Sequence, residues 1–320
     1  MLQKRSFFPI TVGALIIGLC LYYALHAPVT RTGRGQVKIN QGLELEDAYH
    51  RVIAIDTIPS RVISVAPNLT EIIFALGEGK RLVGRTDYCD YPAEAASIES
   101  IGNITEPNIE KIVALNPDFV IASTHFQKET LDKLENLGIK VAILKGEESF
   151  DGLYHLIRQV GQVLHSERKA TELVLDLQKR VADIVLKVEQ APKLKVFYLI
   201  FYGDSGFYTA GQDTFIGNII AMAGGDNVAA DSKGWQYSIE KLVAQDPDIL
   251  ICSKFYHAKE VLEKTAGFKE IRAVKDGKVL EIDHNLLDRQ GPRLVEGLET
   301  LARLLHPEVF SAGQGGASRL

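Results

Sequence analysis

The sequence "NIEKIVALNPDFVIAS" occupies residues 108–123, and "SIEKLVAQDPDILICS" occupies residues 238–253. Nine of their sixteen positions are identical, in the same order and without a gap. Each stretch predicts a short helix, a turn at Asn/Asp-Pro-Asp and a buried strand. The chain therefore uses one supersecondary unit twice, and we expect two regions of similar build.

The segments around both stretches alternate between strand and helix. Further strands are predicted at residues 61–67, 81–87, 140–145, 195–200, 207–211 and 278–283. Further helices are predicted at residues 68–77, 127–137, 150–164, 214–223, 258–264 and 291–305. In the first of these helices, Asn68 is expected to cap the start and Gly77 to end it. Such alternation is typical of a mostly parallel sheet covered on both faces, so we predict an α/β fold with lobes at residues 51–165 and 192–306.

The segment between the lobes, residues 166–191, predicts one long helix. Its apolar positions recur every three or four residues, at Ala170, Leu173, Leu177, Val181, Ile184 and Val188. Ser166 can cap its start and Pro192 can end it. About 23 residues at 1.5 Å each give roughly 34 Å, the width of a lobe. One stiff helix is thus expected to join the lobes, with a ligand cleft between them.

The first 30 residues differ from the rest, because two basic residues precede a charge-free apolar run of 19 residues. This run is long enough to span a bilayer, and its basic flank predicts export of everything after it. Leu25 makes a poor signal-peptidase site, and Leu19 makes a poor lipoprotein signal before Cys20. We expect an uncleaved anchor; a cleaved signal peptide and lipidation are the alternatives. Residues 31–50 are expected to be a tether, and residues 307–320 a disordered tail.

Composition excludes some functions. The net charge is −5 and the pI is about 5.9, so no basic surface for nucleic acid or anionic lipid is expected. Cys89 and Cys252 fall in different halves of the chain, and we expect both to be free thiols.

The exported body resembles the substrate-binding proteins of ABC importers for vitamin B12 and iron chelates. The resemblance covers residues 51–305. It is carried by the two "IEK" stretches, "PSRVISVAPNLTEIIFALG" (59–77), "VGRTDYCDYP" (83–92) and "DRQGPRLVEGL" (288–298). It implies a monomeric binding protein in the periplasm or on the outer face of the cytoplasmic membrane, with no catalytic residue and no cofactor. It also implies that the solute passes to a permease dimer with its ATPase subunits.

The resemblance assigns a role to one acid in each repeat. In the family, a surface glutamate of each lobe docks onto arginines of the permease, and the matching residues are Glu110 and Glu240. A purely structural reading is also open, because an acid in the first turn of a helix is favoured by about 0.3–1 kcal/mol through the macrodipole. That reading does not require the same acid in both lobes.

The resemblance also implies four ligand contacts, which are Tyr88, Tyr208, Trp235 and Arg289. Aromatic rings and an arginine suit a large, flat macrocycle fringed with amides, so a corrinoid such as cobalamin is the expected ligand. Each aromatic residue could instead be a packing residue, and Arg289 could pair on the surface with Asp288 or Asp283.

A ferric siderophore or haem is the alternative ligand. The chain lacks three polar or aromatic residues of well-known cobalamin binders, having Ile104, Ser123 and Asn285 in their places. Haem would need an axial ligand, for which the candidates are Tyr88, His125, His257 and His284. No histidine pair has metal-ligand spacing. A trianionic chelate would require several cations in the cleft, from Arg85, Lys233, Lys254, Arg289 and Arg293.

An enzyme is the alternative from a different class. The stretch "GDSGF" (203–207) is similar to a serine-protease nucleophile loop, but it lacks the next glycine and a histidine in the expected context. The sequence contains no nucleophile elbow and no phosphate-binding glycine motif. A membrane-anchored α/β enzyme would need a site that the sequence does not reveal.

Overall fold

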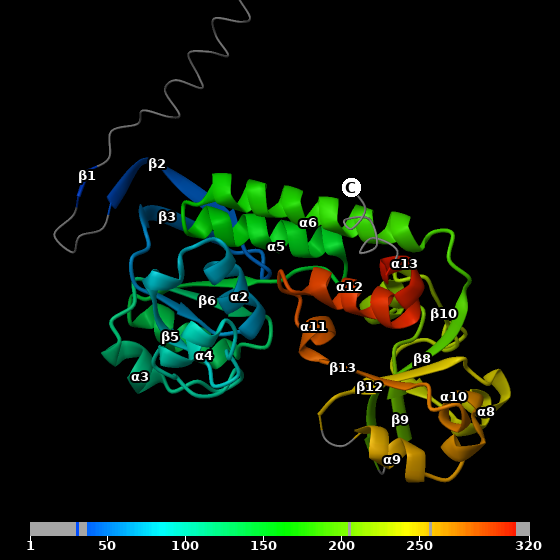
Figure 1. Ribbon diagram of the computed structural model, residues 1–320. Helices are drawn as coiled ribbons and strands as arrows, with labels where there is room; N and C mark the ends of the chain where they lie inside the picture. Colours follow the sequence, from blue (N-terminus) through cyan, green and yellow to red (C-terminus); the bar gives the residue numbers. More distant parts are fainter. Residues whose placement is uncertain (1–29, 32–36, 204–205, 256–257, 312–320) are drawn as a thin grey trace, which may run out of the picture.

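The structure is a computed structural model that describes residues 30–31, 37–203, 206–255 and 258–311. Two α/β lobes lie along one long helix, α6 (Glu167–Val188), as predicted (Figure 1). Within the described ranges, no helix combines the length and the hydropathy of a membrane span. The apolar run of residues 1–30 that predicts an anchor or signal falls almost entirely outside these ranges.

The N-terminal lobe is built on four parallel strands, in the spatial order β5 (Leu82–Arg85), β4 (Val62–Ser64), β6 (Phe119–Ser123) and β7 (Lys140–Leu144). Alternate side chains of these strands pack into two different clusters. One face is covered by α2 (Pro67–Ala75) and α5 (Phe150–Val163). The other is covered by α3 (Ile109–Ala114) and α4 (Lys128–Asn136).

The C-terminal lobe repeats this plan with a mixed sheet. Its strands follow the order β11 (Gln236–Tyr237), β9 (Gly206–Thr209), β8 (Leu194–Gly203), β12 (Ile249–Ser253) and β13 (Val279–Ile282), and β10 (Gly225–Asn227) also pairs with β8. The pairs β8–β10, β8–β12 and β12–β13 are parallel, whereas β9 pairs antiparallel with β8 on one side and with β11 on the other. Its inner face packs on α7 (Phe215–Met222) and α12 (Leu294–Leu305). Its outer face packs on α8 (Ile239–Gln245), α9 (Ala258–Lys264) and α10 (Arg272–Lys275).

The repeat in the sequence is also a repeat in backbone geometry. Asn116 and Asp246, at equivalent positions, both have positive φ, 46° and 45°. Asparagine and aspartate tolerate this left-handed conformation better than other non-glycine residues. Two residues later, Asp118 Oδ1 accepts the backbone N–H of Arg61, the residue before β4, at 3.0 Å, and Asp248 Oδ2 accepts one in β8 at 2.8 Å. Each Asn/Asp-Pro-Asp turn therefore ties its strand to the neighbouring strand.

The prediction that residues 31–50 form a tether is wrong for most of that range. Strand β2 (Val37–Glu46) pairs antiparallel with β3 (Val52–Ile58) and with β1 (Thr30–Arg31). The buried carboxylate of Asp47 accepts a backbone N–H from β7 at 3.2 Å, so this sheet lies along the otherwise free edge of β7. The predicted tail is likewise corrected, because it begins with α13 (Pro307–Ser311), and residues 312–320 lie outside the described ranges.

Two predicted helix caps are wrong as well. Helix α2 begins at Pro67, with Ala66 at the cap position and no side-chain cap, so Asn68 lies inside the helix. Proline suits this first position because its φ is already helical and its missing N–H needs no partner. Gly77 has φ 71° and ends the helix as predicted. Ser166 does not cap α6, because its Oγ donates to Glu78 Oε1 at 2.8 Å.

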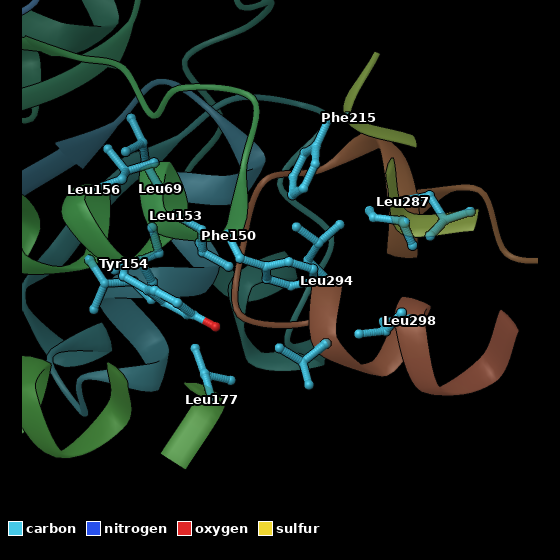
Figure 2. Close-up of a cluster of buried hydrophobic side chains, with 14 of the residues drawn as sticks. Leu69, Phe150, Leu153, Tyr154, Leu156, Leu177, Phe215, Leu287, Leu294 and Leu298 are labelled. Atoms are coloured by element: carbon cyan, nitrogen blue, oxygen red, sulfur yellow. The ribbon is translucent and has the colours of Figure 1, made fainter. Parts of the chain in front are cut away.

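One hydrophobic core runs through both lobes. Ala170, Leu177, Ile184 and Val188 of α6 are buried in it, as their spacing predicts. Phe150 of α5 makes an edge-to-face contact with a phenylalanine of α7, with ring centroids 5.4 Å apart. Figure 2 shows this contact region, with Phe150 beside the leucines of α12. The helices α5, α6, α7 and α12 thus form a shared layer between the two sheets.

Candidate ligand cleft between the lobes

A cavity of about 520 Å³ lies where the two lobes meet. The N-terminal lobe contributes residues after β4, β6 and β7, and the C-terminal lobe contributes the end of α11 (Asn285–Asp288) and the loop that follows it. The cavity is lined by Ala66, Pro67, Asn68, Ile104, Ser123, Thr124, His125, Leu144, Lys145, Gly146, Glu148, Asp288, Arg289 and Gln290. It therefore lies at the carboxyl ends of parallel strands, the usual place for ligands in open α/β sheets.

Two arginines of the C-terminal lobe bind two carboxylates of the N-terminal lobe beside this cavity. Arg289 donates from Nη1 and Nη2 to the two carboxylate oxygens of Asp90, at 2.5 and 3.3 Å. Arg293 donates from Nη2 and Nε to the carboxylate of Glu71, at 2.6 and 3.1 Å. Arg289 Nη1 is also 3.5 Å from Glu71 Oε1. We call these four residues the interlobe clasp.

The opposite charges of the interlobe clasp stabilise one another. The hydrogen bond from Arg289 lowers the pKa of Asp90. Burial alone would lower the pKa of Arg289 and of Arg293, but their bonds to the carboxylates outweigh it and raise both pKa values. Glu71 is almost completely buried in α2 and is the acid that both arginines approach. Asp90, Arg289 and Arg293 are therefore held in their charged forms at neutral pH.

The loop that carries the arginines fits closely against α2. A Cβ atom on Gly291 would lie only 2.9 Å from Glu71 Oε2, so this position needs a glycine for the close approach. Asn68 Nδ2 donates to the backbone oxygen of Gln290 at 3.5 Å. The guanidinium of Arg293 stacks on the ring of Tyr91, 3.8 Å from its centroid. On the other side of the clasp, a second cavity of about 460 Å³ is bounded by α2, α6 and α12.

The C-terminal lobe presents aromatic side chains near the ends of its strands. The pairing of β8 with β9 shifts register between Leu199 and Phe201, which indicates a bulge. Beyond the bulge, the ring centroids of Phe201 and Tyr208 lie 6.0 Å apart on one face of the strand pair. Tyr202 stacks on Phe207 on the other face, with ring centroids 4.9 Å apart. The bulge thus turns Phe201 away from the outer core, and its side chain is exposed.

The structure brings some predicted ligand contacts together and leaves others apart. Of the four, only Arg289 lines the cavity. The backbone segments that carry Tyr208 and Trp235 are neighbours, because β9 pairs with β11 and Thr209 N–H donates to the Trp235 carbonyl at 2.7 Å. Tyr88 lies two residues before Asp90, on the loop held by Arg289. Tyr88 is 56% and Trp235 42% exposed, so neither is a core residue.

Arg289 does not pair with Asp288 or Asp283 among the described residues, because its partners Asp90 and Glu71 come from the other lobe. Lys254 pairs instead with Asp283 at 3.0 Å. Of the five candidate cations, only Arg289 lines the cavity. Arg293 is bound to Glu71, and Arg85 donates to backbone carbonyls.

Sequence reasoning missed several charged residues of this site. Lys145, Glu148 and Asp288 line the cavity, and burial raises the pKa of Asp288. Glu71 left a signal, because it is an acid within the apolar run of α2 and lies among buried positions. A buried carboxylate predicts a cationic partner, but nothing in the sequence names one 222 residues away.

The predicted docking residues occupy equivalent, exposed places. Glu110 is in the first turn of α3 and Glu240 in the first turn of α8. Both side chains are exposed, and neither has an ion pair among the described residues. The adjacent lysines bind other acids, since Lys111 lies 3.2 Å from a glutamate and Lys241 lies 3.5 Å from an aspartate. Figure 1 shows α3 and α8 in different lobes, far from each other and from α6.

Across the described ranges, no three His, Cys, Asp or Glu side chains gather in a way that could hold a metal ion. Cys89 and Cys252 are buried and free, as predicted.

Comparison with known proteins places the chain among solute-binding proteins. A family profile described as periplasmic binding protein matches residues 62–286. An uncharacterised ABC transporter substrate-binding lipoprotein of Bacillus subtilis, YvrC, is 34% identical over 83% of this chain and 86% of its own length. A cobalamin-binding protein of Halobacterium salinarum is 28% identical over 81% of this chain and 73% of its own length. The solved structure of the periplasmic haem-binding protein RhuT from Roseiflexus sp. matches with a TM-score of 0.71 and 28% identity, covering 78% of this chain and 99% of that one.

Proposed function

The chain belongs to the periplasmic binding protein family, as an extracytoplasmic substrate-binding protein and not an enzyme, and on that basis we propose that its ligand is a corrinoid of the cobalamin type. The corrinoid is captured in the interlobe cleft and delivered to an ABC importer. The observation that carries this proposal is the charge balance of the cavity. Its arginine is already bound to Asp90, and two acids face one further lysine in the lining.

A trianionic iron chelate would need several free cations in the same place, since burying net charge without partners is costly. The described cavity offers no such surplus. A cobalamin ring is fringed mainly with neutral amides, which need donors and acceptors rather than net positive charge. The exposed aromatic residues Tyr88, Phe201 and Trp235, and Tyr208 beside Phe201, offer apolar area for such a ring. The similarity to a cobalamin-binding protein supports the same ligand.

Haem is the second candidate, and one side-chain arrangement favours it. The imidazole of His284 accepts or donates a hydrogen bond with Ser253 Oγ at 2.8 Å and lies edge-on to the ring of Phe255. A histidine held in this way beside an aromatic ring can serve as an axial ligand for haem iron. The similarity to a solved haem-binding protein also supports this candidate.

Titration calorimetry of the full-length chain in detergent separates these ligands. We expect saturable binding of cyanocobalamin, and no binding of a trianionic ferric siderophore. Heat from haem or the siderophore, together with none from cyanocobalamin, would rule the corrinoid out. Protein purified from its own host gives an independent check, because a corrin, a haem and a siderophore absorb visible light differently.

Replacing Trp235 with alanine should weaken corrinoid binding roughly tenfold or more, because a large ring that covers the ligand is lost; one decade corresponds to about 1.4 kcal/mol. Calorimetry with cyanocobalamin measures the change. Leu186→Ala is the matched control, since that side chain is also exposed but lies on α6. Equal affinity of the Trp235 variant and the control would remove Trp235 from the site.

Ligand binding should change the shape of the protein very little. The lobes share one core through α5, α6, α7 and α12, and the interlobe clasp joins them again at the cleft. Bending such an assembly would break packed contacts as well as charge-assisted hydrogen bonds. Small-angle scattering with and without cyanocobalamin should give the same radius of gyration within error. A domain closure of many degrees would contradict this prediction.

A further inference from the structure

Asp90 of the N-terminal lobe holds the guanidinium of Arg289 beside the first cavity. Both carboxylate oxygens of Asp90 accept from Arg289, at 2.5 and 3.3 Å. The side chain of Asp90 is 62% exposed, whereas that of Arg289 is only 15% exposed. Arg289 lines the cavity of about 520 Å³, and Asp90 is not among the described residues that do so. Asp90 therefore acts on the cavity wall through Arg289.

The backbone on which Asp90 lies is fixed without the help of Arg289. The preceding residue, Cys89, is buried, and its N–H donates to the carbonyl of Thr86 at 3.0 Å. Thr86 is also buried, and its hydroxyl oxygen lies 3.1 Å from the sulfur of Cys89. The carboxylate of Asp90 is thus a fixed point, to which the longer and more flexible side chain of Arg289 adapts.

A second carboxylate attracts Arg289 away from the first cavity. Glu71 Oε1 lies 3.5 Å from Arg289 Nη1 and accepts from Arg293 Nη2 at 2.6 Å. The side chain of Glu71 is 2% exposed, so its attraction for a cation is weakly screened by water. Glu71 lines the second cavity, on the far side of the interlobe clasp. Without Asp90, we expect Arg289 to turn toward Glu71 and to leave the wall of the first cavity.

The bond to Asp90 leaves Arg289 with donors for a ligand. A guanidinium carries five N–H groups. Asp90 accepts from two of them, and Nη1 also faces Glu71. Among the described residues, no acceptor is bound to the Nε–H or to the second N–H of Nη2. Burial lowers the pKa of Arg289, but the bond to Asp90 and the charges of both acids raise it overall, so these donors belong to a charged group.

We infer that Asp90 is a positioning residue for ligand binding, which holds the Arg289 guanidinium at the wall of the first cavity and away from Glu71. The inference rests on the proposed function for the use of this cleft as the ligand site, and it deepens that function by assigning how the arginine of the cleft is held. Carbonyl oxygens of a ligand, such as those of the amides around a corrin ring, then meet donors that are already oriented. Less conformational freedom is lost when such a ligand binds.

The test measures whether Asp90 acts through Arg289. Titration calorimetry with cyanocobalamin compares the full-length wild type with Asp90→Asn, Arg289→Met and the double variant. Asp90→Asn keeps the shape of the side chain without its charge, and should bind roughly five- to tenfold more weakly because Arg289 loses its orientation. In the Arg289→Met background the same substitution should change the affinity less than about twofold, since the group that it positions is gone. Asp132→Asn is the matched control, because it breaks an exposed ion pair with Lys128 at 2.8 Å on α4, and it should bind as the wild type does.

Two further measurements separate positioning from a purely structural role. Asp90 is exposed and exposed ion pairs contribute little to stability, so Asp90→Asn should unfold at the same temperature as Asp132→Asn. Heteronuclear NMR follows the Nε–H signal of Arg289, which is assigned by its absence in Arg289→Met. Cyanocobalamin should shift this signal in the wild type and shift it much less in Asp90→Asn.

The outcomes distinguish the inference from the proposed function. Unchanged affinity of Asp90→Asn, or an equal loss in the Arg289→Met background, overturns the inference. Tighter binding by Asp90→Asn also overturns it, because Asp90 would then compete with the ligand for Arg289. If the wild type binds haem and not cyanocobalamin, the corrinoid is excluded, and the same variants titrated with haem decide the role of Asp90 by the same criteria.

Discussion

Reversing both charges in Glu110→Lys/Glu240→Lys is expected to abolish uptake while ligand affinity stays unchanged. The two acids occupy the same place in both lobes, are exposed, and have no ion pair among the described residues. The lysine that follows each of them is bound to another acid, so it leaves the glutamate charge available. Losing one side of a desolvated interfacial charge pair typically costs about 2–5 kcal/mol, and reversal adds repulsion. Uptake of labelled ligand by cells that express the importer, with calorimetry on the purified variant, measures both quantities.

The control must remove the same helix-terminal charge elsewhere. Glu129 is exposed in the first turn of α4, so Glu129→Lys loses a comparable macrodipole interaction of about 0.3–1 kcal/mol without touching either repeat. It should transport normally. Unimpaired uptake by the double variant would leave only the dipole interpretation of the two glutamates.

The architecture of both lobes was predictable because its determinants are local. The paired "IEK" stretches contain their own N-caps, Asn108 and Ser238, whose side chains accept backbone N–H groups at 2.9 and 3.2 Å. Their turns contain the Asn or Asp that tolerates positive φ. The spacing of apolar residues in α6 likewise identified the face that the structure buries. Each of these signals acts within a few residues, which is the range that periodicity and propensity describe.

The N-terminal sheet was missed although its signal was also local. Strand β2 ends in "LELE", which alternates between apolar and polar residues with a period of two, and β3 reads "VIAIDTI", which is rich in β-branched residues. Leu45 of β2 and Ile55 of β3 are both buried. The stretch "RTGRGQ" (31–36) suggested a tether, but the strands that follow it bury one face of their sheet against α5 and β7.

The site was less predictable, because its geometry depends on residues that are distant in the chain. Arg289 was identified through family resemblance, but its partners were not, since Asp90 lies 199 residues earlier. The bulge in β8 changes which face carries Phe201, and no feature of "KVFYLI" predicts it. Asp288 was considered only as a surface partner of Arg289. Its orientation into the cavity follows from how the loop after β13 docks onto the other lobe, and pattern alone does not contain that information.

Removing the carboxylate of Glu71 is expected to have the largest effect on stability. Glu71 is buried, accepts two hydrogen bonds from Arg293 and lies 3.5 Å from Arg289. Glu71→Ala leaves buried guanidinium charge without its partner, and breaking a buried pair in this way typically costs about 3–5 kcal/mol. Equilibrium unfolding in urea, followed by circular dichroism, measures the free energy of unfolding. Glu94→Ala removes an exposed acid that borders the second cavity, which Glu71 also lines. Its free energy of unfolding should stay within about 0.5 kcal/mol of wild type.

A second variant shows whether the cost comes from the unpaired charge. Glu71→Leu/Arg293→Met removes both partners and replaces them with apolar side chains of similar volume. Replacing a whole buried pair is often neutral or stabilising, so the double variant should recover most of the stability that Glu71→Ala loses. In the double variant, Arg289 keeps its partner Asp90 but loses Glu71. Calorimetry of ligand binding to this variant therefore tests whether the interlobe clasp supports the cleft. A double variant as unstable as Glu71→Ala would contradict the charge argument and attribute the loss to packing around α2.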